Sequence, residues 1–72
     1  MENKVINIIS SISKISPEEL NAKKDVEKLW ESITHVEIIV ALEEEFDIMF
    51  EQEEIAQMTT VSKIIDLVSS KV

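Results

Sequence analysis

The residues of this sequence that could do chemistry gather around one serine, Ser32. Glu31 precedes it directly, and His35, the only histidine of the chain, follows three positions later. At helical spacing, Glu31 and His35 would share a face and could offer two ligands to a metal ion. Ser32 and His35 would be the only local nucleophile and base, but no oxyanion pocket can be inferred beside them. We therefore expect no catalytic residue and no metal site, and we interpret His35 as a half-buried side chain that is hydrogen-bonded locally.

Ser32 also lies where a helix is predicted to begin, and we expect it to be the N-cap residue. The first turn of a helix presents unpaired N–H groups and a partial positive charge, which together favour a phosphate. A phosphodiester on Ser32 would therefore cost the fold little. The alternative is an unmodified serine, because serine is among the commonest N-cap residues.

Acidic residues form the second chemical feature of the chain. The net charge is −8, and the stretch between Lys28 and Lys63 contains many acids and no lysine or arginine. Such a surface repels nucleic acids and anionic membranes, and it speeds the encounter with proteins that have basic patches. We expect no nucleic-acid partner and no membrane insertion. Consecutive acids such as Glu43-Glu44-Glu45 point in different directions on a helix, so a solvated face fits them better than paired acid–base catalysis.

The helix that follows Ser32, expected to end near Phe46 or Asp47, has two apolar stripes. A surface helix needs only one apolar face for its own core, so the second stripe requires another purpose. We expect one side to hold the fold together and the other to meet partner proteins. The core-facing stripe consists of Ile38, Ile39, Leu42 and Phe46. The second stripe consists of Ile33, Val36 and Val40, mixed with Glu37, Glu44 and Asp47.

Other helices are predicted over about residues 3–14, 51–57 and 61–69. A Ser16-Pro17 helix-start signal opens residues 15–31, but the apolar repeat then stops. We expect those residues to form a long irregular connection pinned by Leu20, Val26 and Leu29. Within it, Asp25 is a candidate cap for a brief turn, and Trp30 is expected at the edge of the core or of a binding site.

Composition favours one small all-α domain over residues 1–72. The chain has no glycine, one proline and no cysteine, which disfavours hairpin turns and glycine-rich phosphate loops and excludes disulfides. We expect a bundle of three main helices and one short helix. Neither a signal peptide nor a membrane span is predicted, so we expect a cytoplasmic protein, and a monomer.

A family pattern covers the second half of the chain. Glu31-Ser32-Ile33, then Val36-Glu37, then the run ALEEEFD at 41–47 are similar to the acyl carrier proteins, and the similarity continues without a gap to about Asp66. The resemblance implies that Ser32 carries 4'-phosphopantetheine, donated from coenzyme A by a phosphopantetheinyl transferase, and that an acyl group is held on it as a thioester. It implies no enzymatic activity of the chain itself.

The resemblance also implies roles for other positions. The partners would be the transferase and acyl-handling enzymes with basic docking patches. The docking residues would be Glu31, Ile33, Val36, Glu37, Val40, Glu43 and Glu44. Positions matching the core and acyl pocket are Leu42, Phe46 and Met58.

Departures from the family pattern cluster near the serine. Glu31 stands for the usual aspartate, Ile33 for leucine, Leu29 for glycine, and Thr34-His35 for Asp-Thr. The broader prediction is a fatty-acid-like or specialised acyl pathway, and these departures favour a carrier dedicated to a specialised pathway. The alternative function is an unmodified acidic adaptor that binds a basic protein through the same helix, and an enzyme built around His35 is the third hypothesis.

Overall fold

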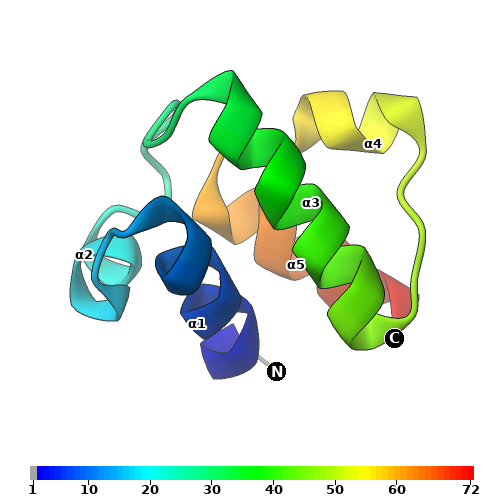
Figure 1. Ribbon diagram of the computed structural model, residues 1–72, viewed down its shortest axis with the longest axis horizontal. Coiled ribbons are helices and arrows are strands. Elements are labelled where there is room, and N and C mark those ends of the chain that lie inside the picture. The colour runs from blue at the N-terminus through cyan, green and yellow to red at the C-terminus, as the bar shows by residue number, and fades with distance from the viewer. Residues whose placement is uncertain (1) are drawn as a thin grey trace.

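Polar N-cap residues open two of the helices in the described part of the chain. Ser16 caps one helix by accepting the Glu19 N–H at 3.2 Å, and Thr60 caps another by accepting the Lys63 N–H at 3.2 Å. The computed structural model describes residues 2–72, within which all regular structure is helical (Figure 1). The helices are α1 (Glu2–Ser13), α2 (Pro17–Ala22), α3 (Ser32–Phe46), α4 (Gln52–Gln57) and α5 (Val61–Lys71).

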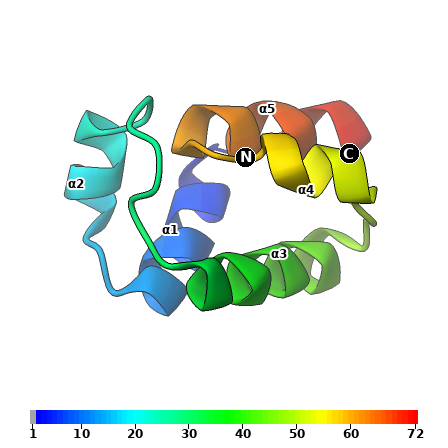
Figure 2. The same cartoon turned by 90° about the horizontal axis from the view of Figure 1, so that it is seen from above.

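The three longer helices form the body of the bundle. Helix α1 packs against α2, α3 and α5. Figure 2 shows α3 and α5 on opposite sides, with the short helices α2 and α4 toward the two ends. The principal extents are 26 × 22 × 18 Å. This arrangement confirms the all-α bundle, and it leaves one side of α3 without a helical neighbour.

The core consists of apolar side chains from α1, α2, α3 and α5, together with Phe50 and Met58 from the connections on either side of α4. In the core-facing stripe of α3, Ile38 and Leu42 are fully buried, whereas Phe46 at its end is only partly buried. Of the apolar residues of α1, Ile8 and Ile12 pack only at the margin of the core. The buried apolar residues are Val5, Ile6, Ile9, Leu20, Ile38, Ile39, Leu42, Phe50, Met58, Val61, Ile64 and Val68.

The prediction of an irregular connection over residues 15–31 is wrong for its first part, which forms α2. Pro17 occupies the first helical position, where its missing N–H would have no partner, and Leu20 is buried against the core. With a single buried residue, α2 offers no apolar repeat from which a helix could be recognised. The bundle therefore contains two short helices instead of the predicted one.

The rest of this connection is irregular, but polar contacts hold it. The brief turn expected after Asp25, over residues 26–28, does not form, and Val26 is exposed and does not pin the segment. Instead, the Ser62 N–H donates to the Lys24 carbonyl at 3.1 Å, and the Thr59 hydroxyl donates to the Glu27 carboxylate at 3.3 Å. These bonds fasten the connection to the start of α5.

Without glycine, other residues adopt the left-handed conformation where helices end. Lys14 follows α1 with φ 67°, and Asp47 follows α3 with φ 55°. The Asp47 N–H donates to the Glu43 carbonyl, which closes the last turn of α3. Lys28, in the connection before α3, has φ 60°. The last helix extends to Lys71, two residues beyond its predicted end.

Candidate functional site

Ser32 is the first residue of α3 and is exposed to solvent. The prediction that it is the N-cap is wrong by one position. Glu31 has the extended backbone of an N-cap, and its carbonyl accepts the first helical hydrogen bond, from the His35 N–H at 2.9 Å. No side-chain hydrogen bond caps this end of α3. The Ser32 hydroxyl therefore has no capping role, and it lies beside helical N–H groups that still need acceptors.

The two apolar stripes predicted on α3 lie on opposite faces of the helix, one toward the core and the other toward solvent. Ile38 and Ile39 are buried, whereas Ile33 and Val36 leave 75% and 59% of their surface exposed. Val40 is 47% exposed. The acids of the outer stripe, Glu37, Glu44 and Asp47, are exposed as well. The structure thus brings Ser32 and an outward apolar stripe, bordered by carboxylates, onto one helix.

Glu43 differs from the other predicted docking residues. Its side chain is half-buried, and its Oε2 atom accepts the Phe50 N–H at 2.9 Å. The carboxylate therefore fixes the connector between α3 and α4, next to the buried Phe50 ring. Sequence reasoning missed this contact, because no spacing rule links two residues seven positions apart across a helix end.

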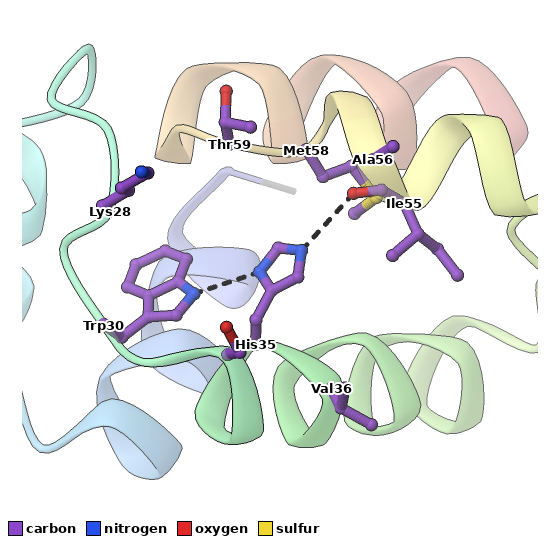
Figure 3. Close-up of a pocket in the computed structure, with 9 residues that line it drawn as sticks. Lys28, Trp30, His35, Val36, Ile55, Ala56, Met58 and Thr59 are labelled. Carbon is purple, nitrogen blue, oxygen red and sulfur yellow. Dashed lines mark hydrogen bonds between the residues drawn. The ribbon is translucent and has the colours of Figure 1, made fainter.

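A hollow of about 360 Å³ lies beside Ser32. The connection before α3 forms one wall, the first turn of α3 another, and α4 with the residues after it a third (Figure 3). The hollow is open to solvent and its lining is mainly apolar. The lining residues are Lys28, Trp30, Ser32, His35, Val36, Ile55, Ala56, Met58 and Thr59.

A hydrogen-bonded bridge crosses this hollow and joins its three walls. The Trp30 Nε1–H donates to His35 Nδ1 at 3.1 Å, and the two rings stack with centroids 6.3 Å apart and planes 16° apart. On its other side, His35 Nε2 lies 3.4 Å from the Ile55 carbonyl oxygen (Figure 3). Because Nδ1 accepts, neutral His35 carries its proton on Nε2 and donates to Ile55. The prediction of a half-buried, locally bonded His35 is confirmed.

Helix α4, which supplies the Ile55 carbonyl, is itself fixed by an acid. The Glu54 carboxylate accepts the Glu51 N–H at 2.7 Å and pairs with Lys71 Nζ at 3.0 Å. The hydrogen bond from Glu51, and after it the contact with Lys71, lower the pKa of Glu54 below its ordinary value. Lys71 also lies over the Phe50 ring, 5.8 Å from its centroid. The far wall of the hollow is thus tied to the end of α5.

The Glu31–His35 pair does not form a metal site in this arrangement. Both ring nitrogens of His35 are engaged, one by Trp30 and the other by Ile55. Within residues 2–72, no group of three or more potential ligand side chains comes together. No helix of that same part of the chain has the length and apolar character that crossing a bilayer requires.

A group joined through a phosphate to Ser32 would fit this end of α3. The hydroxyl is exposed, the first-turn N–H groups have no side-chain cap, and an apolar hollow lies alongside. The phosphate would lie where helix N–H groups and the macrodipole favour negative charge. A flexible chain beyond the phosphate would find an apolar surface within reach.

Comparison with known proteins agrees with this fit. Residues 3–68 match the family described as phosphopantetheine attachment site. The chain is 38% identical over 73 residues to the acyl carrier protein of Buchnera aphidicola subsp. Schizaphis graminum, covering 99% of this chain and 92% of that protein. It is 40% identical over 76 residues to the acyl carrier protein of Buchnera aphidicola subsp. Acyrthosiphon pisum (strain 5A), covering 90% and 92%.

Both similarities cover nearly the whole chain, so they concern the bundle as well as the region around the serine. The family carries 4'-phosphopantetheine covalently and works with acyl-handling enzymes. Its members are carriers and not catalysts, which removes the hypothesis of an enzyme built around His35. The chain belongs to the acyl carrier protein family.

Proposed function

We propose that Ser32 is the attachment site of 4'-phosphopantetheine and that the chain presents acyl groups from this site to partner enzymes. The observation that carries the proposal is the position of Ser32, exposed at the first residue of α3 and lining the apolar hollow. Sequence similarity supports it, because the match to the phosphopantetheine attachment site family covers residues 3–68, which include Ser32. No observation favours the unmodified acidic adaptor.

The attachment chemistry needs only a hydroxyl from this chain. Ser32 Oγ would form a bond to the phosphorus that bears the pantetheine portion of coenzyme A. The bond from that phosphorus to the bridging oxygen would break, adenosine 3',5'-bisphosphate would leave, and the serine proton would pass to a base of the transferase. The attached arm supplies a terminal thiol, which the chain lacks because it has no cysteine.

The outward face of α3 is the proposed docking surface for the transferase and for the acyl-handling enzymes. Exposed apolar side chains bordered by acids suit partners with an apolar contact surrounded by lysine and arginine. The proposed docking residues are Glu31, Ile33, Val36, Glu37, Val40, Glu43 and Glu44, of which Glu43 also has the structural contact with Phe50.

We also propose that the chain serves a fatty-acid-like or specialised acyl pathway. The residues nearest Ser32 support it, because Trp30 and His35 give this end of α3 a bridge made of side chains that the family pattern does not have. It also includes a single domain over residues 1–72, a monomer, and a cytoplasmic location that suits a chain without cysteine.

Intact mass spectrometry tests the attachment. The unmodified protein is incubated with coenzyme A and a phosphopantetheinyl transferase of broad specificity, and we expect the mass of one phosphopantetheine group to be added. Ser32→Ala should gain nothing, whereas the matched control Ser69→Ala, an exposed serine on α5, should gain the full mass. Full modification of Ser32→Ala would contradict the proposal.

A further inference from the structure

We propose that the hollow beside Ser32 holds a short acyl group and that the Trp30–His35–Ile55 bridge keeps longer acyl chains out of the helical core. The inference rests on the proposed attachment at Ser32 and names the class of cargo. Its basis is that one pair of hydrogen bonds joins three wall segments, of which Trp30 and His35 are five residues apart and Ile55 lies twenty residues further along the chain.

The bridge lies between the attachment point and the interior. A chain tethered to Ser32 would reach the core by passing between α3 and α4, and the His35 side chain already spans that gap to the Ile55 carbonyl. Trp30 supports His35 from the opposite wall, through its N–H and by stacking. Passage would therefore require the His35 side chain to move aside, which breaks both hydrogen bonds and leaves a half-buried indole N–H without an acceptor. Without the Trp30 donor, His35 would be held only by its 3.4 Å contact with the Ile55 carbonyl, so it would move aside more easily.

Behind the bridge, the interior is filled by side chains. Met58, which lines the hollow, is fully buried, and so are the core residues Ile38 and Leu42, which follow His35 by about one and two turns of α3. Protein interiors are close-packed, so a long chain would have to displace these groups instead of entering an existing space. In the bridged conformation, the cargo therefore stays in the outer hollow.

The size and lining of the hollow set the class of cargo. A volume of about 360 Å³ is near the lower end of small-molecule sites, which run from about 300 to about 1,000 Å³. The end of the prosthetic arm must share this space with the acyl group. The flat rings of Trp30 and His35 and the apolar side chains of Val36 and Ile55 suit a short aliphatic group.

Trp30 is the only tryptophan, so its indole N–H gives a single NMR signal at the site. Acetyl, butyryl and octanoyl forms are made with the transferase and the matching acyl-coenzyme A, and intact mass verifies each loading. We expect acetyl and butyryl loading to shift the indole signal while the methyl signals of Ile38 and Leu42 stay in place. We expect octanoyl to leave those core methyl signals unchanged too, with its chain end remaining solvent-accessible.

Two variants test the bridge itself. Trp30→Phe keeps an aromatic ring but removes the donor to His35, and His35→Ala removes both hydrogen bonds. In each, octanoyl loading should shift the Ile38 and Leu42 methyl signals. Thr34→Ala, a neighbour on α3 that does not line the hollow, should behave as the wild type. If His35→Ala does not fold, Trp30→Phe still decides the question.

The failures of the two proposals are distinguishable. If no loading occurs, the attachment at Ser32 and the inference that rests on it are both wrong. If loading occurs but short cargo leaves the Trp30 signal unmoved, or octanoyl shifts the core methyl signals of the wild type, only the inference is overturned. Unchanged core signals in octanoyl-loaded Trp30→Phe would also overturn it.

Discussion

The two faces of α3 contain the same kinds of apolar residue and differ in what covers them. On the inward face, Ile38 is fully buried between the helices, whereas Ile33, five positions earlier on the outward face, is 75% exposed. Apolar side chains on an outward stripe gain little from folding, because most of their surface stays in water. Exposed apolar patches bordered by polar groups often mark interaction sites.

The difference shows that the hydrophobicity of α3 serves two purposes. The inward face stabilises the bundle, and the outward face is available for contacts outside the chain. The acids divide in the same way, since Glu43 is engaged with the Phe50 N–H while Glu44, next to it, is exposed. Three predictions test this division, beginning with the largest expected effect, and a fourth tests an anchored acid of α4.

Truncation of the same residue type on each face should have very different effects on stability. We expect Ile38→Ala to lower the free energy of unfolding by about 2–5 kcal/mol, because it removes buried surface and leaves a cavity. Ile33→Ala should change it by less than about 0.5 kcal/mol. Urea unfolding followed by circular dichroism measures both. Equal losses would show that the outward face also supports the fold.

A polar substitution on the outward face should impair loading without loss of stability. We expect Val40→Asn to lower kcat/KM for modification by the transferase about tenfold, or about 1.4 kcal/mol, because it removes an apolar contact. Met49→Asn is the matched control, since Met49 is 81% exposed but lies outside α3. Equal loading rates for the wild type and Val40→Asn would remove Val40 from the docking surface.

Removal of the two neighbouring acids, Glu43 and Glu44, should also have different effects on stability. Glu43→Ala should lower the free energy of unfolding by about 1 kcal/mol, because the Phe50 N–H loses a charged acceptor. Glu44→Ala should be nearly neutral for stability. Urea titrations of the two variants, fitted with a common slope, make the comparison. A neutral Glu43→Ala would mean that water replaces the carboxylate at no net loss.

The smallest effect concerns an anchored acid outside α3. The pKa of folded Glu54 is lowered from its ordinary value of 4.5, so its charged form stabilises the fold above that pH, and this contribution is lost as the pH falls through the lower, folded-state value. Glu54→Gln should therefore lower the Tm at neutral pH, and the difference from the wild type should shrink below pH 4.5.

Glu53→Gln, the exposed neighbour on α4, is the control for this pH dependence. Thermal unfolding across the acid range compares the three proteins. If the Tm of Glu54→Gln stays below that of the wild type by the same amount at every pH, the lowered pKa of Glu54 does not contribute to stability.

Much of the fold could be predicted from the sequence, because helical periodicity and capping are local. The three longer helices, the short α4 and the inward and outward stripes of α3 all follow from residues within a few positions of one another. For helix α2 only the start signal at Ser16-Pro17 could be recognised, because the helix has one buried residue and therefore no apolar repeat.

At the site, the sequence determined which serine to consider and why a phosphate would be favoured there. The exposed hydroxyl on the first residue of α3 instead of the cap, and the contact between Glu43 and Phe50, were decided by how the chain enters and leaves that helix. The hydrogen bond from His35 to Ile55, twenty positions away, exists only because α4 packs beside the first turn of α3. Local pattern sets the helices, whereas contacts between distant residues depend on packing that only the tertiary structure decides.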